Sequence, residues 1–326
     1  MTGKTRWGVI GTGAMAQRGA AALSRMKTAQ MVAVASRSAD AANRFADAFD
    51  IPHRSGGVEN IAQNPEVDAV YIATPPALHA GQALCCVEAG KSVLCERPFA
   101  INSREAAPVI KLAGEKGLFL MEAQWTRFMP ATQTLKKWLA EKLIGDVEMV
   151  LGGGGYASSC DSQTSLFDLE AGGGVLLNRG VDFIAMASLI LGRPATMTSI
   201  GALNEHDIDD QEMILLGYSG GRMANLTLSG KLTWPPDLTV VGEAGSIRVH
   251  APLTAPPALT LTTGTDSKTV TFDEPRDGIT AGFSEMMDCM AQRRLESALM
   301  RRDETVQILD MLNEIRLQIG LRFPTE

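Results

Sequence analysis

Cysteine and histidine are scarce in this chain, and neither shows the spacing of a disulfide framework or a metal site. The five cysteines are odd in number and contain no C-x-x-C pair: Cys85, Cys86, Cys95, Cys160 and Cys289. This pattern favours reduced thiols and a cytoplasmic location. The four histidines form no H-x-H or H-x-x-x-H pattern, so we expect no metal site.

Runs of like charge are also missing, and we expect no secretory leader. The 30 Lys and Arg residues against 37 Asp and Glu residues give a net charge of −7, which does not supply the basic face that nucleic acid requires. Met1 is not followed by a basic segment and an apolar run. The most apolar stretch, Val175–Leu191, is interrupted by Asn178, Arg179 and Asp182, and we expect it to be too polar for a membrane span.

The chain that remains has the composition of an ordinary globular protein. Its 326 residues are 45 % hydrophobic and 21 % charged, with no internal repeat and no low-complexity linker. At roughly 150 residues per domain this length predicts about two domains.

Residues 1–122 alternate short apolar runs with helical patterns. The expected strands are Trp7–Ile10, Met31–Ala35, Ala69–Ala73, Ser92–Cys95 and Leu118–Met121. The expected helices are Met15–Arg25, Ala39–Phe49, Ile61–Gln63, His79–Ala89 and Ser103–Lys116. Parallel strands buried on both faces read as continuous apolar runs and need helical crossovers, so the pattern predicts a doubly wound α/β domain.

Residues 123–326 show a different pattern of helices and strands, typical of an α+β domain. Two helices are expected, at Ala131–Leu143 and Gly174–Leu191, and a helical segment at 282–320 with a break near Glu296. The strands expected between them are mostly antiparallel: Val147–Tyr156, Ala195–Ala202, Gln211–Tyr218, Met223–Ser229, Leu238–Val241, Ser246–Val249, Leu259–Thr263 and Thr269–Phe272.

A glycine-rich turn between the first strand and the first helix predicts a dinucleotide site. The segment Gly11-Thr12-Gly13-Ala14-Met15-Ala16 matches G-x-G-x-x-A. The first glycine allows a tight turn, the second allows the backbone to approach a pyrophosphate, and the small last residue lets helix and strand pack closely. The helix N-terminus offers N–H groups to the phosphates. The alternative is a tight βα turn with no ligand.

The end of the second strand favours NADP(H) over NAD(H). An acidic residue at this point binds the ribose hydroxyls of NAD, whereas an arginine accommodates the 2′-phosphate of NADP. Here the chain reads Ser36-Arg37-Ser38, with no acid before Asp40. A guanidinium flanked by two hydroxyls can bind that phosphate. The alternative is a solvated loop arginine.

Three further motifs, with the glycine-rich turn, resemble one known family. They are Ala73-Thr74-Pro75-Pro76-Ala77-Leu78-His79, Cys95-Glu96-Arg97-Pro98 and the run from Met121 to Pro130. In order and spacing they resemble the glucose–fructose oxidoreductase/inositol dehydrogenase/MocA family of NAD(P)-dependent oxidoreductases. The dimeric dihydrodiol dehydrogenase branch is the most similar, on the evidence of Trp125-Thr126-Arg127-Phe128, Asp209-Asp210-Gln211 and Gly320-Leu321-Arg322-Phe323-Pro324.

The resemblance covers essentially the whole chain and carries several implications. It implies a Rossmann domain, a second domain with an open, mostly antiparallel sheet, and a homodimer or higher homo-oligomer formed through that sheet. It also implies a cofactor pocket that includes Thr74, Pro75, His79, Glu96, Arg97, Trp125 and Arg127. We expect His79 to form hydrogen bonds below the nicotinamide site and Glu96 to be a fixed pocket residue. Trp125 is expected as a core or pocket wall, and Arg127 as a ligand contact or a salt bridge.

The chain departs from the family pattern at three positions. Arg97 stands in place of a lysine, Asn178 in place of an aspartate, and Asp182 in place of a tyrosine or histidine that transfers a proton. Residues 178 and 182 share one face of a helix. Arg97 stays protonated and can stabilise an alkoxide but cannot shuttle a proton. Asp182 can act as a general base, or it can simply pair with Arg179 while Asn178 caps local backbone.

These residues lead to one preferred function and two alternatives. The preferred function is hydride transfer between NADP(H) and a carbonyl or hydroxyl carbon of a small polar substrate, with an anion, a sugar or a cyclic diol as the options. The arginines at 97, 127 and 179 motivate the anionic option. The alternatives are an NADP-binding regulator without redox turnover, and an elimination or epimerisation enzyme that retains its cofactor.

Overall fold

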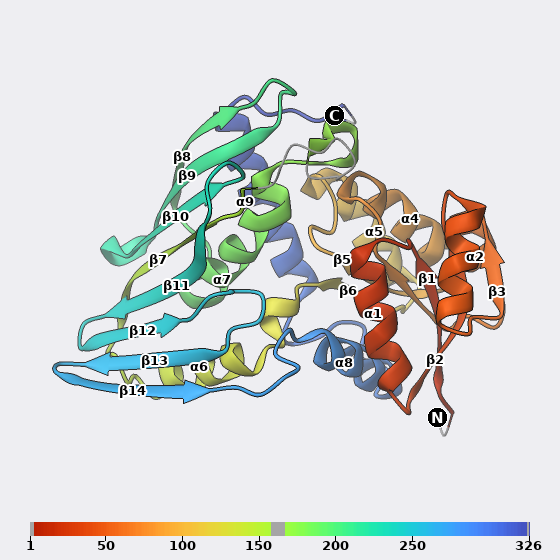
Figure 1. The fold of residues 1–326 in the computed structure, drawn as a ribbon, viewed down its shortest axis with the longest axis horizontal. Helices are drawn as coiled ribbons and strands as arrows, with labels where there is room; N and C mark the ends of the chain where they lie inside the picture. Colours follow the sequence, from red (N-terminus) through yellow and green to blue (C-terminus); the bar gives the residue numbers. More distant parts are fainter. Residues whose placement is uncertain (1–2, 158–166, 325) are drawn as a thin grey trace. The chain divides into compact units, whose positions relative to one another are not determined.

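A computed structural model describes residues 3–157, 167–324 and 326 (Figure 1). The chain forms two compact units, Met1–Ala123 with Ile279–Val306, and Gln124–Gly278 with Gln307–Glu326. The segment 279–306 lies far beyond residue 122, where the sequence places the domain boundary. Packing rather than chain order defines a compact unit, and the assignment of cofactor and substrate roles to the two parts stays a prediction. Cys160 lies outside the described residues.

The first unit contains a six-stranded parallel sheet. Its order is β3 (His53–Ser55), β2 (Ala29–Ala35), β1 (Thr5–Ile10), β4 (Ala69–Ile72), β5 (Ser92–Glu96), β6 (Leu120–Ala123). This 3-2-1-4-5-6 order is that of a dinucleotide-binding fold, with its switch point between β1 and β4. The predicted doubly wound sheet is therefore confirmed. The sequence analysis missed β3, because its three residues are exposed or half-buried and form no apolar run.

Helices connect these strands and pack on the sheet. They are α1 (Ala14–Arg25), α2 (Ala39–Ala48), α3 (Val58–Ala62), α4 (Pro76–Glu88), α5 (Ser103–Glu115) and, from the later segment, α8 (Ile279–Ala291). Helix α1 approaches β4 closely, since a Cβ on Gly19 would lie 2.3 Å from Tyr71 Cε1. The ring of Phe283 on α8 lies 5.1 Å from both the Trp7 and Tyr71 rings. This aromatic contact explains why residues 279–306 belong to the first unit.

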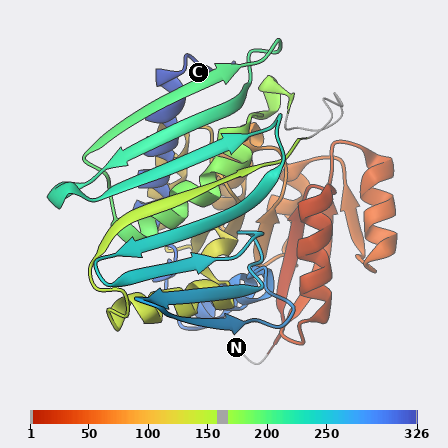
Figure 2. The same ribbon diagram turned by 60° about the vertical axis from the view of Figure 1, so that its left-hand side comes forward.

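The second unit contains an eight-stranded sheet, which Figure 2 shows with one face toward the viewer. Its order is β14 (Asp266–Thr271), β13 (Ala258–Thr263), β12 (Gly245–Val249), β11 (Trp234–Gly242), β7 (Val147–Gly155), β10 (Met223–Ser229), β9 (Asp209–Gly217), β8 (Thr196–Leu203). All neighbours are antiparallel except β7 and β10, which are parallel. The expected class, a mostly antiparallel sheet in an α+β unit, is confirmed.

Helices line one face of this sheet. They include α6 (Pro130–Ala140), α7 (Val181–Leu191) and the later part of α9 (Arg302–Gln318). A Cβ on Gly152 of β7 would lie 3.0 Å from Phe183 of α7, and Ser199 of β8 donates to the Ile315 carbonyl of α9 at 2.9 Å. The helix expected at Gly174–Leu191 begins as a π-helical turn, Leu176–Gly180.

The apolar stretch that ends with helix α7 corrects one expectation. Among the described residues, Leu169–Leu191 is long and apolar enough by composition to cross a membrane, with a mean hydropathy of 1.5, and 78 % of it is buried inside the protein. Its polar residues do not make the segment too polar for a span, so the argument from composition was wrong. Burial is what identifies the segment as a core helix.

Candidate functional site

The glycine-rich turn has the geometry that a bound dinucleotide needs. Gly11 has φ +108°, and a Cβ there would lie 2.4 Å from the Ala73 carbonyl oxygen. Gly13 is the N-cap of α1, no side chain caps that helix, and a Cβ on Gly13 would enter open space. Ala16 is fully buried. The first amides of this 12-residue helix have no side-chain cap and face open space. Such free amides are the donors that a pyrophosphate requires.

The end of β2 lies beside this turn. The hydroxyls of Thr12 and Ser36 are 3.3 Å apart. Ser38 is the N-cap of α2, where its hydroxyl accepts from the Ala41 amide at 3.2 Å. Arg37 is exposed, and the first acidic residue, Asp40, already lies in the first turn of α2. The structure thus leaves a cation and a hydroxyl at the place where the adenosine ribose of a dinucleotide is bound.

His79 connects the loops after β4 and β5. Its ring is buried, with Nδ1 at 2.8 Å from the Pro98 carbonyl oxygen and Nε2 at 2.7 Å from the Thr74 carbonyl oxygen. Burial lowers the pKa of His79. A neutral ring donates to only one of the two carbonyls at a time. Thr74 also donates from its hydroxyl to Gln82 at 2.6 Å, and Pro75 is the N-cap of α4.

Glu96 and Arg97 follow each other at the end of β5. Glu96 is buried and accepts from the Tyr71 hydroxyl at 2.6 Å. Burial, followed by the Glu96 charge, raises the pKa of Tyr71 well above its ordinary value, so Tyr71 is a permanent donor at physiological pH. This contact fixes the Glu96 carboxylate, and its place in a cofactor pocket stays a prediction. Arg97 is half-buried in the loop after the strand.

In the second unit, Asp182 lies against the segment that follows β6. It is 4 % exposed, in the first turn of α7, and its Oδ1 accepts from the Gln124 side-chain amide at 3.2 Å. The same amide donates to the Thr126 hydroxyl at 2.9 Å. Gln124 was not among the expected site residues, although it stands inside the quoted run from Met121 to Pro130. Its carboxamide oxygen is buried without a partner among the described residues.

The neighbouring aromatic and basic residues are held within the second unit. Trp125 is buried in a short 3-10 turn, Trp125–Arg127. Arg127 is 2 % exposed and donates to the Ala185 carbonyl of α7 at 2.9 Å. Arg179 lies over the Tyr156 ring, 4.4 Å from its centroid. These contacts give Arg127 and Arg179 structural roles on and around the α7 helix.

Asn178 and Asp209 shape the start of that helix. The Asn178 side-chain amide donates to the Gly174 carbonyl at 2.9 Å, which is the local capping role weighed for it above. Asp209 of β9 accepts from the Leu176 amide at 2.6 Å. Gly174 has φ +110°, and a Cβ there would lie 1.8 Å from Asp209 Oδ1. Burial raises the pKa of Asp209 to about 7. No local pattern predicts this contact, because Asp209 lies 33 residues from Leu176 in the chain.

The candidate site residues therefore fall into two groups, one in each unit. The first unit gathers Gly11–Met15, Ser36–Ser38, Thr74, Pro75, His79, Glu96 and Arg97, all at the carboxyl ends of adjacent parallel strands, where open α/β sheets bind ligands. The second unit gathers Trp125, Arg127, Asn178 and Asp182 around the start of α7. Within the parts of the chain that the structure describes, no group of three or more His, Cys, Asp or Glu side chains forms a metal site.

Comparison with known families assigns the class of protein. Residues 5–124 match the Gfo/Idh/MocA oxidoreductase family with its NAD-binding Rossmann fold, and residues 132–248 match the C-terminal domain of the same family. The chain belongs to this family of NAD(P)-dependent oxidoreductases of small substrates. Its first unit is an NAD(P)-binding Rossmann domain.

Individual relatives support this membership over the full length. The chain is 31 % identical to trans-1,2-dihydrobenzene-1,2-diol dehydrogenase from Mus musculus over 98 % of both chains. It is 30 % identical to the human protein of that name, again over 98 % of both chains.

Solved structures share the fold. A 3-ketoreductase from Actinomadura kijaniata, crystallised with NADP and TDP-benzene, has a TM-score of 0.87 at 23 % identity, covering 97 % of this chain and 98 % of its own. Levoglucosan dehydrogenase, solved with NADH and levoglucosan, has a TM-score of 0.88 at 20 % identity, covering 97 % of each chain.

Proposed function

We propose that this protein is an NADP(H)-dependent oxidoreductase that transfers hydride between nicotinamide and a carbonyl or hydroxyl carbon of a small polar substrate. The observation that carries the choice of NADP(H) is the end of β2, where Arg37 is exposed and no acid precedes Asp40. NADP in the similar 3-ketoreductase agrees with this choice. NADH in levoglucosan dehydrogenase shows that the fold accepts either cofactor, so the local residues decide.

The catalytic roles are proposed for three residues. When bound, NADP(H) supplies or accepts the hydride. Arg97 stabilises negative charge on the substrate oxygen, since a guanidinium stays protonated. Asp182 accepts the hydroxyl proton when the alcohol is oxidised and returns it in the reverse direction, with Gln124 orienting its carboxylate at 3.2 Å. The Asn178 amide is engaged with Gly174 at 2.9 Å, which leaves its carboxamide oxygen as the group that accepts from substrate.

The substrate class is proposed from two sources. Relatives named as dihydrodiol dehydrogenases favour a cyclic diol or sugar-like hydroxyl compound. An anionic substrate finds less support, because Arg127 donates to a backbone carbonyl and Arg179 lies over a tyrosine ring. Among the three arginines considered, Arg97 is then the one that would bind a carboxylate.

Cofactor titration tests the central choice. NADPH and NADH binding should be compared by nicotinamide fluorescence in the wild type, in Arg37→Ala, and in Arg25→Ala as a control at the opposite end of α1. We expect Arg37→Ala to weaken NADPH about 10- to 100-fold and to leave NADH unchanged, as for loss of a charge-assisted phosphate contact. Equal affinity of the wild type for both cofactors would contradict the NADP(H) assignment.

Turnover tests the catalytic roles. NADP-linked oxidation of cyclic diols and sugars, and NADPH-linked reduction of keto acids, should be assayed with wild type and Asp182→Asn. We expect the substitution to lower kcat at least about 100-fold with the NADPH Kd unchanged, because a general base is lost. An unchanged kcat would remove Asp182 from the reaction.

The three replaced family positions motivate a second candidate, an NADP-binding regulator without turnover. Tight NADPH binding, no oxidation against the whole panel and no gain from Arg97→Lys with Asp182→Tyr would favour it. A third candidate is elimination or epimerisation with a retained cofactor. Substrate conversion without net consumption of copurified cofactor would identify that reaction.

A homodimer, or a higher homo-oligomer, is proposed through the open sheet, in a reducing cytoplasmic setting. Large apolar side chains lie exposed on adjacent strands, with Ile200 76 %, Met213 60 %, Leu215 54 % and Met223 50 % exposed. Ile200 pairs directly with Met213 and both side chains are exposed, so they form one apolar surface on neighbouring strands. Figure 2 shows that one face of this sheet has no helices over it. Met213→Lys with Leu215→Lys should give monomers in sedimentation experiments, and a monomeric wild type would contradict this proposal.

A further inference from the structure

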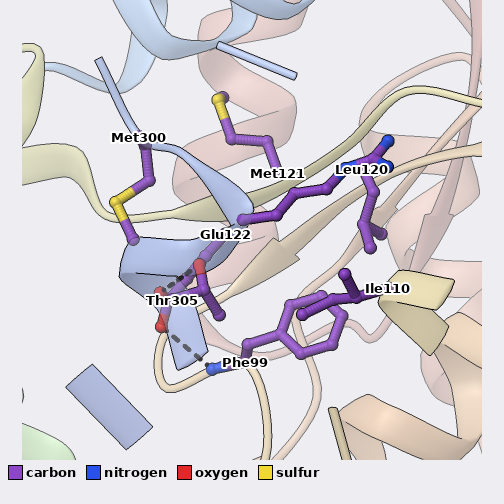
Figure 3. A pocket seen from close by; sticks show the side chains of 8 residues that line it. Phe99, Ile110, Leu120, Met121, Glu122, Met300 and Thr305 are labelled. Carbon is purple, nitrogen blue, oxygen red and sulfur yellow. Dashed lines mark hydrogen bonds between the residues drawn. The ribbon is translucent and has the colours of Figure 1, made fainter. Parts of the chain in front are cut away.

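A buried carboxylate in the first unit lies beside the turn that carries Arg97. Glu122 of β6 is 1 % exposed. Its Oε1 accepts from the backbone amide of Phe99 at 3.0 Å, and its Oε2 accepts from the hydroxyl of Thr305 on α9 at 3.1 Å. Figure 3 shows the carboxylate between these two donors. Phe99 is the second residue after Arg97, so the contact acts directly on the proposed catalytic turn.

The surroundings of Glu122 make the burial of a carboxylate energetically unfavourable unless it is hydrogen-bonded. The small cavity around Glu122 is lined mainly by apolar side chains, among them Phe99, Ile110, Leu120 and Met300 (Figure 3), and Arg302 and Thr305 are its other polar members. Removing a carboxylate from water costs several kcal/mol unless hydrogen bonds compensate, and an apolar residue of similar size would leave the Phe99 amide and the Thr305 hydroxyl without this acceptor. Core packing alone therefore does not account for an acid at this position.

The peptide group between Pro98 and Phe99 has a side-chain partner at each of its polar ends, with the neutral His79 ring as the donor to its carbonyl when the ring proton is on Nδ1. Its carbonyl oxygen lies 2.8 Å from His79 Nδ1, and its N–H donates to Glu122 at 3.0 Å. Both contacts are buried. A peptide group is planar, so two contacts on opposite edges fix its orientation and limit rotation about the adjoining bonds. These two side chains therefore fix the Pro98–Phe99 peptide, the second peptide after Arg97.

The second donor to Glu122 sits on an anchored helix start. Arg302, the first residue of α9, donates to the carbonyls of Leu118 and Leu295, each at 2.6 Å. Thr305 follows one turn later and reaches Glu122. The start of α9 is thus tied to Leu118, just before β6, and to Glu122 within β6, and it holds the carboxylate oxygen that Phe99 does not bind.

We propose that Glu122 and Thr305 form a brace that sets the position of the Arg97–Phe99 turn, and with it the Arg97 guanidinium. Glu122 is a positioning residue that touches neither substrate nor cofactor. The inference rests on the proposed role of Arg97. Small displacements of a catalytic group cost rate rather than binding, since the reacting atoms must lie within narrow limits.

Four substitutions test the brace. Glu122→Gln keeps the shape but has only one acceptor oxygen for two donors, and Thr305→Val removes one donor. Thr305→Ser keeps that donor and is the conservative rescue. Glu105→Gln is the matched control, because Glu105 accepts from the Ile101 amide of the same segment at 3.4 Å but does not touch the peptide after Arg97.

Two readouts are needed, kinetics and amide hydrogen exchange. We expect Glu122→Gln and Thr305→Val to lower kcat about 10- to 100-fold, with the NADPH Kd within about twofold of wild type. Thr305→Ser and Glu105→Gln should stay within about threefold in kcat. Exchange of the Phe99 amide should accelerate at least about tenfold in Glu122→Gln and Thr305→Val and stay unchanged in Thr305→Ser.

The outcomes separate this inference from the proposed function. Folded Glu122→Gln and Thr305→Val proteins with unchanged kcat, or with unchanged Phe99 exchange, would overturn the brace. If the wild type converts no substrate, the proposed function fails, and the exchange pattern alone decides whether the brace exists. Should Glu122→Gln fail to fold, the Thr305→Val and Thr305→Ser pair supports or overturns the inference by the same readouts.

Discussion

The two sheets place their polar residues in different ways. In the parallel sheet, β4 and β5 are buried at every position, and the candidate residues lie at or just beyond the strand ends, with Glu96 as the last residue of β5. In the larger sheet, β9 alternates buried and exposed residues, and its buried positions include Asp209 and Glu212. Both sheets thus bury acids, but Glu96 and Glu122 of the first unit accept hydrogen bonds, whereas neither oxygen of Glu212 has a partner among the described residues.

This difference has consequences for stability. Loop residues at a sheet edge can change ligand binding with little effect on folding. Buried acids change the free energy of unfolding whenever the pH or their partner changes, because charge in the interior is costly. Glu212 is the extreme case, with both carboxylate oxygens buried and unpartnered among the described residues and its pKa raised by burial to about 9.

The largest effect is expected at Gly11. Gly11→Ala places a Cβ 2.4 Å from a carbonyl oxygen at φ +108°, and should lower the free energy of unfolding by about 3 kcal/mol or more and abolish NADPH binding. Denaturant titration and cofactor fluorescence measure both. Gly13→Ala is the contrast, since its Cβ enters open space: it should cost less than about 1 kcal/mol yet weaken NADPH at least about tenfold. Unweakened binding in Gly13→Ala would contradict the pyrophosphate site.

The next effect is the pH dependence caused by Glu212. Its pKa of about 9 in the folded protein lies above the ordinary value of 4.5, so the folded state retains a proton that the unfolded state releases. Stability therefore falls as the pH rises from about 4.5 to about 9, by about 3 kcal/mol at pH 7. Denaturation of Glu212→Gln at several pH values should show a flatter dependence than wild type. Glu148→Gln, exposed on β7, should leave the slope unchanged, and parallel curves for wild type and Glu212→Gln would contradict the argument.

A smaller effect is expected at Asp209, the cap of the helix that leads to Asp182. Asp209→Ala removes the acceptor of the Leu176 amide at 2.6 Å and should cost about 1 to 2 kcal/mol, whereas Asp209→Asn keeps an acceptor and should cost less. The pKa of Asp209 is raised from 3.8 to about 7, so its contribution declines as the pH rises through that range. The cost of Asp209→Ala should then be larger at pH 5 than at pH 8, and the reverse order would contradict the raised pKa.

The smallest effect is expected from an ion pair on the surface of the same sheet. Arg248 donates to Asp237 at 2.7 and 3.1 Å, and both contacts are exposed. Arg248→Ala should change the free energy of unfolding by less than about 1 kcal/mol, because solvent screens the pair. Urea denaturation of the variant beside Glu212→Gln compares exposed and buried charge in one sheet. A loss above 2 kcal/mol, roughly twice the usual limit for exposed pairs, would contradict the expected difference between exposed and buried charges.

The sequence predicts the regular elements well where a local pattern defines them. The strand Met223–Ser229 has the predicted bounds in the structure, since its apolar alternation and flanking glycines are contiguous. The start of α7 is different, because its π-helical turn at Leu176–Gly180 goes with a carboxylate cap 33 residues away in the chain. The return of α8 to the first unit is likewise absent from any local pattern, because it depends on the contact of Phe283 with Trp7 and Tyr71.

The candidate site divides in the same way. Gly11, Gly13 and Arg37 could be recognised from the sequence, since a strand, a tight turn and a helix follow one another directly. Gln124 beside Asp182 could not, because 58 residues separate them. The roles of Arg127 and Arg179 also depended on the fold, since their partners lie at Ala185 and Tyr156.

The sequence by itself determined the parallel sheet, the glycine-rich turn and the absence of an acid between β2 and Asp40, because each follows from neighbouring residues and the steric limits of the backbone. Only the tertiary structure decided which charges are buried and which carboxylate caps the helical turn before α7. It also decided how the Pro98–Phe99 peptide is held between His79 and Glu122. The physical reason is that solvation and hydrogen bonding of a side chain depend on what packs around it, and those partners are distant in the chain.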